Sequence, residues 1–284
     1  MPKKIHLLVI DPQKDFCDPA GSLYVKGAEN DIERLVKFIH KGIDKRTFDD
    51  IHVTMDCHPE LHIAHPCAWV DSKGNNPPPF TMITIEDLES GTWNPRNPGW
   101  YNLFHDYLTS LREYNKTLGK NSRYPMCLWP PHCIIGDQGG AFVDEFSKAI
   151  RRWEHESIAI VNRVTKGSNW KTEHFSALKA DVPDPKDPST QLNVNLLQSL
   201  ENADAILITG EALSHCVANT VLDIADNFSD DSVGKFILLE DTTSPVVSPD
   251  AGVSAHFKDV SDDFVQRMIA RGMQVTTTEK FWNE

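Results

Sequence analysis

The sequence contains no apolar run of 18 residues, which is about the length that a membrane-spanning helix needs. Its opening, "MPKKIHLLVIDPQKDF", places basic residues before an apolar run, but Asp11 and Pro12 end that run after about six residues. A run of that length is too short for the hydrophobic region of a signal peptide. We therefore expect a protein that is neither exported nor inserted into a membrane.

Basic clusters and disulfide patterns are also missing. The chain carries a formal net charge of −13, and no lysine cluster or arginine-rich helix offers a local exception. Such a charge repels phosphate backbones, so nucleic acid is not an expected partner. The six cysteines have no compact disulfide spacing. We expect a cytoplasmic protein in which all of them are thiols.

The sequence does contain alternating strand and helix patterns. Its 284 residues, 40% of them hydrophobic, can bury a substantial core. Short apolar runs that end at polar residues predict six strands, within 5–12, 51–58, 158–167, 205–212, 235–242 and 273–281. Helical periodicity predicts helices within 31–44, 140–156, 193–203, 215–228 and 262–272. This alternation predicts an α/β fold with a mainly parallel six-stranded sheet and helices on both faces, and the length suits one large α/β domain or two smaller ones.

Residues 66–131 interrupt the alternation. This interval is rich in proline, glycine and aromatic residues, as in "GNNPPPF", "TWNPRNPGWY" and "RYPMCLWPP", and it offers one helical pattern, at 101–115. A loop of this length inside a compact domain is usually functional or an inserted subdomain. We predict a lid-like insert or an oligomer contact.

Reactive side chains follow four of the predicted strands. Ligands of an open parallel sheet bind beyond the carboxyl ends of its strands. The residues at or just after these ends are Asp11, Asp56, Lys166 and Cys216. Taken singly, a cysteine is more often core filler, an aspartate a turn former and a lysine a solvated charge. Their coincidence at strand ends favours a catalytic site.

Cys216 is the expected nucleophile of such a site. A helix N-terminus and a nearby ammonium both favour the thiolate form, so we expect Lys166 beside Cys216. Asp11 would take the thiol proton and return it to a leaving amine. The backbone N–H of Cys216, with another from the turn "GEALSH", would receive the developing oxyanion.

A second group of residues fits a metal ion. The segment "DCHPELHIAHP" supplies Asp56, His58, His62 and His65, and "WPPHC" adds His132. Carboxylate and imidazole ligands suit Zn²⁺, Fe²⁺ or Mn²⁺ and leave positions open for water or substrate. The alternative is a polar loop whose histidines cap or pack.

Taken together, these segments resemble a known family. The stretches "LLVIDPQKDFCDPAGSL", "TMDCHPELHIAHP", "LWPPHCIIGDQGGAF", "VTKGSNW" with "EHFSAL", and "GEALSHCVANTVLDIAD" span nearly the whole chain. Their content and order are similar to those of the isochorismatase-like cysteine hydrolases, and within them to the nicotinamidase branch.

The resemblance implies a single domain over 1–284 with a three-layer Rossmann-like fold. It also implies an Asp-Lys-Cys triad, here Asp11, Lys166 and Cys216, that works through a thioester. It also implies a cis peptide bond before Ala212, whose amide joins that of Cys216 in the oxyanion hole. Phe16 would sandwich the substrate ring together with Trp129.

In the nicotinamidase branch, one aspartate and three histidines hold a divalent metal that binds the pyridine nitrogen of the substrate. Zn²⁺ is the first choice here, with Fe²⁺ or Mn²⁺ as alternatives. The ligand positions fall on Asp56, His58, His62 and His132, and His65 is an alternative to His62.

Three features depart from the family pattern. The segment before "WPPHC" is longer than usual, Asp137 replaces a more common threonine, and Ser214 replaces a common aspartate. These departures bear on the substrate more than on the chemistry, because the insert is expected to form part of the pocket wall.

The full ligand set favours a metal-dependent amidohydrolase that releases ammonia from nicotinamide, because metal-free relatives lack that set. A related hydrolase of another small amide, a ureide or a carbamate is the alternative, followed by a metal-binding relative without turnover. Relatives commonly assemble, so the resemblance also implies a homo-oligomer.

Overall fold

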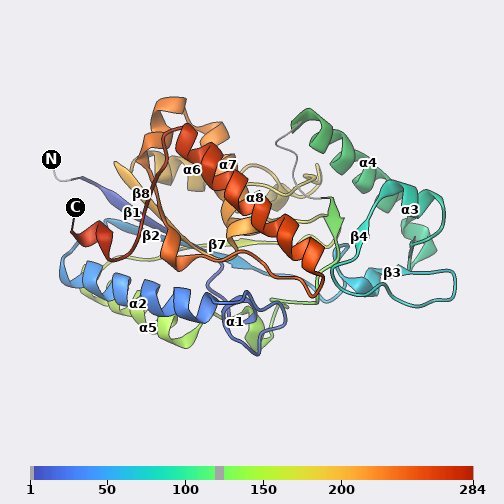
Figure 1. Ribbon diagram of the computed structural model, residues 1–284, viewed down its shortest axis with the longest axis horizontal. Helices are drawn as coiled ribbons and strands as arrows, with labels where there is room; N and C mark the ends of the chain where they lie inside the picture. Colours follow the sequence, from blue (N-terminus) through green and yellow to red (C-terminus); the bar gives the residue numbers. More distant parts are fainter. Residues whose placement is uncertain (1–2, 119–124, 284) are drawn as a thin grey trace.

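A six-stranded parallel sheet forms the centre of the computed structural model, which describes residues 3–118 and 125–283 (Figure 1). The spatial order of the strands is β10-β9-β8-β1-β2-β7, and every neighbouring pair is parallel. The strands are β1 (Ile5–Ile10), β2 (Asp50–Asp56), β7 (Asn162–Lys166), β8 (Ala205–Gly210), β9 (Phe236–Leu239) and β10 (Gln274–Thr276). The predicted Rossmann-like fold with a parallel six-stranded sheet is confirmed.

The path of the chain through the sheet creates a crevice. The chain starts at β1 in the middle, runs outward through β2 to β7, and then returns to β8 on the other side of β1. The strand order therefore reverses between β1 and β8, and ligands of open α/β sheets bind at such a reversal. The six residues of β8 are all buried, which explains why its sequence is continuously apolar rather than alternating.

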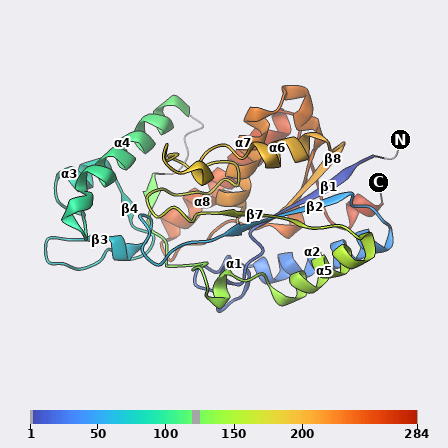
Figure 2. The ribbon, with the colours of Figure 1, turned by 180° about the vertical axis from the view of Figure 1, so that it is seen from behind.

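Helices cover both faces of the sheet, which gives the three layers seen in Figures 1 and 2. One face carries α2 (Ala28–Asp44), packed against α5 (Asp144–Ser157), with the short α1 (Lys14–Cys17) beside them. The other face carries α6 (Val194–Glu201), α7 (Ala218–Asn227) and α8 (Ala251–Ala270).

The helix α2 illustrates why these sequences form a helical layer. Leu35, Phe38 and Ile39 recur at helical spacing and are buried. On the outer side, Lys37 and Glu33 form an ion pair one helical turn apart. Trp282, near the C-terminus of the chain, then packs against Phe38.

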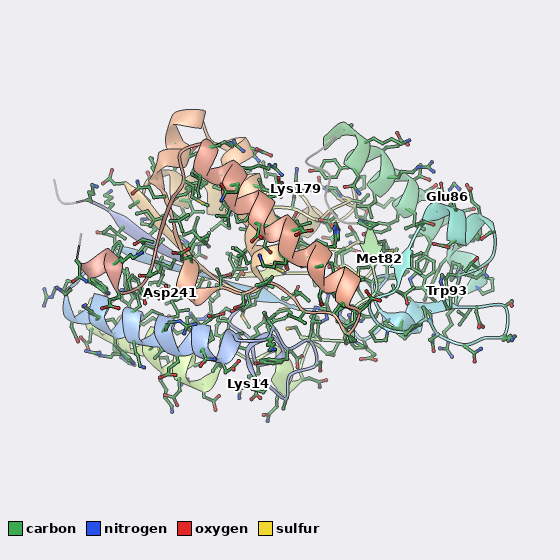
Figure 3. The ribbon with its side chains drawn as sticks, in the orientation of Figure 1. Lys14, Met82, Glu86, Trp93, Lys179 and Asp241 are labelled. Carbon is green, nitrogen blue, oxygen red and sulfur yellow. The ribbon has the colours of Figure 1, made fainter. Side chains whose placement is uncertain are left out.

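The predicted insert folds as a small lobe at the end of the molecule opposite the two termini (Figures 1 and 2). Met82, Glu86 and Trp93 lie in this lobe (Figure 3). Its elements are β3 (Trp69–Val70) paired with β5 (Asn94–Pro95), β4 (Met82–Ile83) paired with β6 (Met126–Cys127), and the helices α3 (Ile85–Glu89) and α4 (Tyr101–Leu118). Trp100 of the lobe contacts Trp170 of the body, with ring centroids 4.8 Å apart.

Short 3₁₀ helices complete the secondary structure. They lie at Pro66–Ala68, Pro98–Trp100, Gln138–Gly140, Pro188–Thr190, Asp230–Lys235, Glu240–Thr242 and Lys280–Trp282.

Two predicted boundaries were wrong. The strand expected from 158 begins only at Asn162, because Ile158 closes α5 in a left-handed conformation and both Ile158 and Ile160 are exposed. The helix expected from 262 begins at Ala251, where the Asp250 side chain accepts a hydrogen bond from the Val253 N–H as an N-cap. No helix in the described part of the chain, α8 included, combines the length and apolarity needed to cross a membrane.

The last residue of β8, Gly210, has a backbone conformation and a close backbone contact that favour glycine. Gly210 has φ of +107°, and a Cβ at this position would collide with the backbone of Ile10 on β1. We expect Gly210→Ala to lower the free energy of unfolding by about 3 kcal/mol or more, because the contact is backbone against backbone. Urea unfolding followed by tryptophan fluorescence measures this loss.

Gly234→Ala is the matched control, because a Cβ there meets no atom within 4 Å. An equal loss of stability in both variants would show that close approach of β8 to β1 is not what requires glycine at 210.

Candidate active site

The carboxyl ends of four neighbouring strands bring the predicted catalytic residues together. The strands β8, β1, β2 and β7 are adjacent in that order. Asp11 directly follows β1, Asp56 ends β2 and Lys166 ends β7. Cys216 lies in the helical turn Leu213–Val217 between β8 and α7. Residues that are distant along the chain thus meet in one crevice at the reversal point.

The ammonium group of Lys166 is the centre of this arrangement. Its Nζ lies 3.0 Å from Asp11 Oδ2, 3.1 Å from Asp56 Oδ1 and 3.5 Å from Cys216 Sγ. Burial lowers the pKa of Lys166, but the carboxylates of Asp11 and Asp56 outweigh burial and hold this pKa well above its ordinary value. Lys166 is therefore charged at neutral pH and balances charge on the two buried carboxyl groups.

Cys216 is a protonated thiol in the resting protein. Burial raises the pKa of Cys216 well above its ordinary value; Lys166 lowers that pKa, while Asp11 and Asp56 raise it further. The expected preference for thiolate is not met, because burial and two carboxyl groups outweigh one ammonium. The sulfur therefore needs a base, and a carboxyl oxygen of Asp11 lies within 4.8 Å of it.

Asp11 has the properties of that base. Burial raises the pKa of Asp11, and Lys166 offsets part of the rise. A raised pKa makes a carboxylate a better proton acceptor near neutral pH. Its position is fixed by Thr54, whose hydroxyl donates to Asp11 Oδ1 at 2.5 Å and accepts from the Asp11 N–H at 3.0 Å.

Gln13, which the sequence analysis did not single out, clamps two of these strand ends together. Its Nε2 donates to the carbonyl oxygen of Asp56, and its Oε1 accepts from the Asp56 N–H, both at 2.7 Å. The "DPQ" tripeptide after β1 was the available signal. Gln13 thereby fixes the position of Asp56 relative to Asp11.

Asp56, His58 and His132 form a group that fits a metal ion. His58 Nδ1 donates to the Gly167 carbonyl oxygen at 3.0 Å, and His132 Nδ1 donates to that of Pro130 at 2.8 Å. Both rings then turn Nε2 toward Asp56 Oδ2, at 3.0 and 3.5 Å. Neighbouring ligand atoms around a tetrahedral ion with bonds of about 2.0–2.1 Å lie about 3.3 Å apart, so these atoms have the required spacing.

The charge state of Asp56 also suits an ion. Burial raises the pKa of Asp56, but His58 and Lys166 more than compensate and place that pKa well below its ordinary value. Asp56 is therefore ionised at neutral pH. The backbone bonds that orient the two imidazoles are the outer contacts commonly found behind metal-binding histidines.

The two remaining histidines of this segment, His62 and His65, differ in the hydrogen bonds that their ring nitrogens make. His62 uses both ring nitrogens on the backbone: Nδ1 accepts from the Ala64 N–H and Nε2 donates to the Thr172 carbonyl oxygen, both at 3.1 Å. His65 Nδ1 donates to the Glu60 carbonyl oxygen, and its buried Nε2 has no hydrogen-bond partner. The ligand role of His62 stays a prediction, and His65 has the free nitrogen.

A small cavity opens onto Cys216. Phe16, Trp129 and Ala212, all named from the sequence, line it together with Asp56 and His132. The sequence analysis missed a second set of lining residues, which are Leu23, Glu173, Phe175, His215 and Val246. The quoted segment "EHFSAL" contains two of these, a carboxylate and an aromatic ring, and was the available signal.

Comparisons with known proteins agree with the fold described above. No family model matches the chain. The curated nicotinamidase of Saccharomyces cerevisiae is 26% identical over 220 residues, which are 78% of this chain and 81% of the yeast protein. The solved structure of the yeast nicotinamidase Pnc1p has a TM-score of 0.62 at 22% identity, covering 96% of this chain and 99% of that one.

Two further solved structures share the fold. A nicotinamidase/pyrazinamidase of Acinetobacter baumanii has a TM-score of 0.60 at 18% identity and covers 99% of each chain. The pyrazinamidase of Pyrococcus horikoshii, in complex with zinc, has a TM-score of 0.53 at 18% identity and covers 96% of this chain and 99% of that one. The chain is thus similar in sequence to a nicotinamidase over most of its length, and it has the fold of nicotinamidases and of an isochorismatase family protein.

The family resemblance implied a cis peptide bond before Ala212, and the Glu211–Ala212 bond is cis. Ser214, which stands where the family often has aspartate, accepts a hydrogen bond from the Val246 N–H at 3.0 Å. Asp137, the other departure, precedes the short helix Gln138–Gly140. Ser214 thus holds the cavity residue Val246 against the cysteine turn.

A buried carboxyl group stands directly before the predicted oxyanion residue. Burial and the neighbouring Asp31 raise the pKa of Glu211 well above its ordinary value. Glu211 Oε2 accepts from the Ser244 N–H at 3.1 Å, and the Ser244 hydroxyl donates to Asp31 Oδ2 at 2.6 Å. A protonated Glu211 fits this network, because two ionised carboxylates would repel each other in a buried site.

The raised pKa of Glu211 predicts a pH-dependent stability. The unfolded chain releases this proton near the ordinary pKa of 4.5, whereas the folded protein keeps it. The contribution of Glu211 to stability is therefore complete below about pH 4.5 and declines as pH rises toward the folded pKa, by at most about 1.4 kcal/mol per unit. Glu211→Gln removes this decline. The free energy of unfolding of this variant, relative to that of wild type, should therefore increase from pH 5 to pH 8.

Urea unfolding at both pH values measures that difference. Glu201→Gln, at an exposed position, is the control and should follow the wild-type curve. A Glu211→Gln variant with the same pH profile as wild type would contradict the raised pKa.

Proposed function

We propose that this protein is a metal-dependent cysteine amidohydrolase that converts nicotinamide and water to nicotinate and ammonia. The observation that carries the proposal is the contact of one buried ammonium, Lys166 Nζ, with Asp11, Asp56 and Cys216. Through that contact the proposed nucleophile Cys216 and its base Asp11 lie next to Asp56, which belongs to the group that fits a metal ion, and Cys216 and Asp56 line one cavity. The 26% identity to a yeast nicotinamidase supports the choice of substrate.

The chain's own residues account for the proton transfers. Asp11 takes the proton of Cys216 as the sulfur adds to the amide carbonyl carbon. The same carboxyl group then gives the proton to the leaving nitrogen, and ammonia departs from a thioester. Water attacks the thioester carbonyl carbon, Asp11 accepts a proton from that water, and the carbon–sulfur bond breaks. Asp11 then returns this proton to the sulfur, which restores the thiol, and the acid leaves as nicotinate after releasing its own proton to solvent. Lys166 keeps the charge of the site balanced during these steps.

The amides of Ala212 and Cys216 are the proposed oxyanion donors, and Phe16 and Trp129 the proposed walls for the aromatic ring. Both side chains line the cavity that Cys216 enters. Phe16 also meets His132 edge-on, with ring centroids 5.4 Å apart, so the ring pocket and the metal group adjoin. A flat ring with a carboxamide fits a site that has aromatic walls on one side and the thiol on the other.

Asp56, His58 and His132 would hold the divalent ion, which we propose to be Zn²⁺, with Fe²⁺ or Mn²⁺ as alternatives. Such an ion supplies a Lewis acid that binds a ring nitrogen of the substrate and so orients it. The zinc in the related Pyrococcus horikoshii pyrazinamidase supports this choice. The fourth protein ligand is His62, as the sequence predicts, or His65. We favour His65, because its Nε2 is unpaired.

Three further features remain proposals. The segment 66–131 acts as a lid-like insert within a single domain, and it contributes Trp129 to the cavity. The protein is a homo-oligomer, as the family resemblance implies, and it works in the cytoplasm. A related small amide is the alternative substrate, and a panel of amides assayed for ammonia release distinguishes the two.

The nucleophilic role of Cys216 is tested by Cys216→Ala. We expect ammonia release from nicotinamide to fall by at least about 10³-fold, because the described residues that line the cavity include no other cysteine that could form the thioester. Bound metal should remain, since the proposed ligands are untouched. Cys67→Ala is the control: Cys67 is half-buried, lies outside the cavity, and should be dispensable. Turnover retained in Cys216→Ala would rule out covalent catalysis by this residue.

The fourth ligand is tested by the pair His65→Gln and His62→Gln, because both residues are fully buried in the same turn. We expect His65→Gln to weaken metal binding about tenfold or more, and His62→Gln to retain near wild-type affinity. Metal content after dialysis against a chelator-buffered Zn²⁺ solution measures both. The opposite ranking would assign the ligand to His62.

A further inference from the structure

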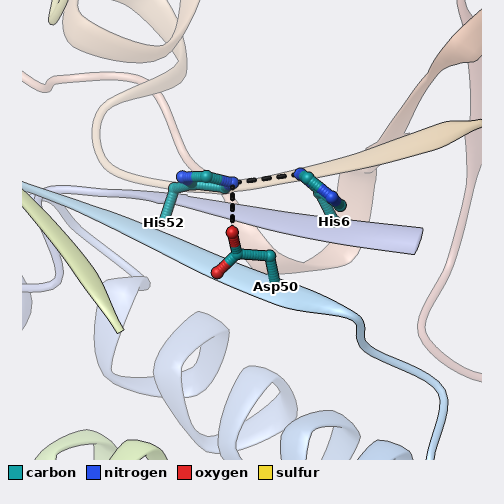
Figure 4. Close-up of side chains that lie close together, drawn as sticks. All are labelled: His6, Asp50 and His52. Carbon is teal, nitrogen blue, oxygen red and sulfur yellow. Dashed lines mark hydrogen bonds and ion pairs between the residues drawn. The ribbon is translucent and has the colours of Figure 1, made fainter. Parts of the chain in front are cut away.

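A second group of imidazoles and a carboxylate lies at the amino end of the sheet, away from the active-site crevice at its carboxyl end. His6 is on β1, and Asp50 and His52 are on β2, with all three side chains on one face (Figure 4). The strand register explains the grouping, because His6 pairs with Asp50 and Leu8 with His52. Asp50 and His52 are two apart on one strand and so share a face, and His6 lies opposite Asp50 on that face.

Their donor atoms have the spacing of a metal site. His52 Nε2 lies 3.1 Å from His6 Nδ1 and 3.7 Å from Asp50 Oδ2 (Figure 4). One ligand atom from each residue lies within 4.8 Å of the others. Around a tetrahedral ion with bonds of about 2.0–2.1 Å, neighbouring ligand atoms are about 3.3 Å apart, so small side-chain adjustments suffice.

Hydrogen bonds outside the group orient these ligands. Asn162, on the neighbouring strand β7, lies 3.1 Å from His52 Nδ1 through its amide nitrogen. When His52 Nε2 loses its proton to bind an ion, Nδ1 carries the proton, and a flipped Asn162 amide accepts it through oxygen. Asp50 Oδ1 accepts from the Ile51 N–H at 2.9 Å, which leaves Oδ2 for the ion.

Charge and exposure favour a bound cation. Burial lowers the pKa of His52 to about 4 and also lowers that of His6, so both rings are neutral and available as ligands at neutral pH. Asp50 and Asp49 both place negative charge near His6. The Asp50 side chain is 34% exposed, whereas His52 is fully buried. An ion can therefore enter past Asp50, and water can complete its coordination.

We propose that His6, Asp50 and His52 form a second divalent-metal site, selective for Zn²⁺, that ties β1 to β2 at the end of the sheet remote from Cys216. Two imidazoles, one carboxylate and a water molecule make a four-coordinate set that suits Zn²⁺. This proposal does not depend on the proposed activity. Because a metal that binds only the folded state stabilises it, the site would act on stability rather than on turnover.

The experiment counts bound Zn²⁺ in the full chain. Wild type, Asp50→Asn and Asp49→Asn are dialysed against chelator-buffered Zn²⁺, and metal is measured per chain. We expect one equivalent fewer in Asp50→Asn than in wild type, and no loss in the control Asp49→Asn. Asp49 is the adjacent exposed carboxylate, whose Oδ2 accepts from the Ile5 N–H, an interaction that asparagine can keep. Equal zinc in all three proteins would overturn the proposal.

A second variant and a second measurement separate this site from the active site. His6→Gln should also lose one equivalent. The rise in melting temperature that added Zn²⁺ gives should be smaller in both site variants than in wild type, and the rise that remains comes from the ion proposed at Asp56. Ammonia release from nicotinamide should stay unchanged in both site variants. A zinc-dependent rise as large as that of wild type in both Asp50→Asn and His6→Gln would show an adventitious ion only and contradict the proposal. The activity of Cys216→Ala does not enter this zinc count. A failure of the proposed function can therefore be told apart from a failure of the second metal site.

Discussion

The buried ion pairs of Lys166 are the interaction on which the candidate site depends. Two carboxyl groups, Asp11 and Asp56, lie within about hydrogen-bond distance of one ammonium and are almost completely buried. Without the lysine, their repulsion and their loss of hydration would oppose folding of this crevice. The same charge lies against Cys216, so one residue connects the stability of the site to the chemistry of its thiol.

The protonation states follow from that constraint. Burial keeps Cys216 as a thiol and raises the pKa of Asp11, while Lys166 stays charged. The site therefore stores its reactive proton on sulfur, next to the carboxyl group that can remove it. This arrangement protects the sulfur until a substrate fills the cavity, because a thiol reacts far more slowly than a thiolate.

The two ends of the parallel sheet are chemically different. At the carboxyl ends, the last strand residues Asp56 and Lys166 meet Asp11 and Cys216 from the segments that follow β1 and β8, and the reversal of strand order between β1 and β8 opens the crevice. At the amino ends, His6, Asp50 and His52 come from the strands themselves and are placed by register. Side chains that can bind a metal are thus brought together by the meeting of strand ends at one edge of the sheet and by strand register at the other.

The sequence by itself determined the alternation of strands and helices, because buried parallel strands are largely apolar. It also predicted that Asp11, Lys166 and Cys216 stand at strand ends, where ligands of such sheets bind, and it named part of the cavity lining but missed five of its residues. The extent of α8 and the start of β7 were not readable, since a cap at Asp250 and a left-handed Ile158 set them. Only the tertiary structure decided which nitrogen each histidine presents, as with His62 and His65, because backbone carbonyls from distant segments orient the rings. It also decided the charge state of Cys216, since burial and the number of neighbouring carboxyl groups are properties of the folded chain.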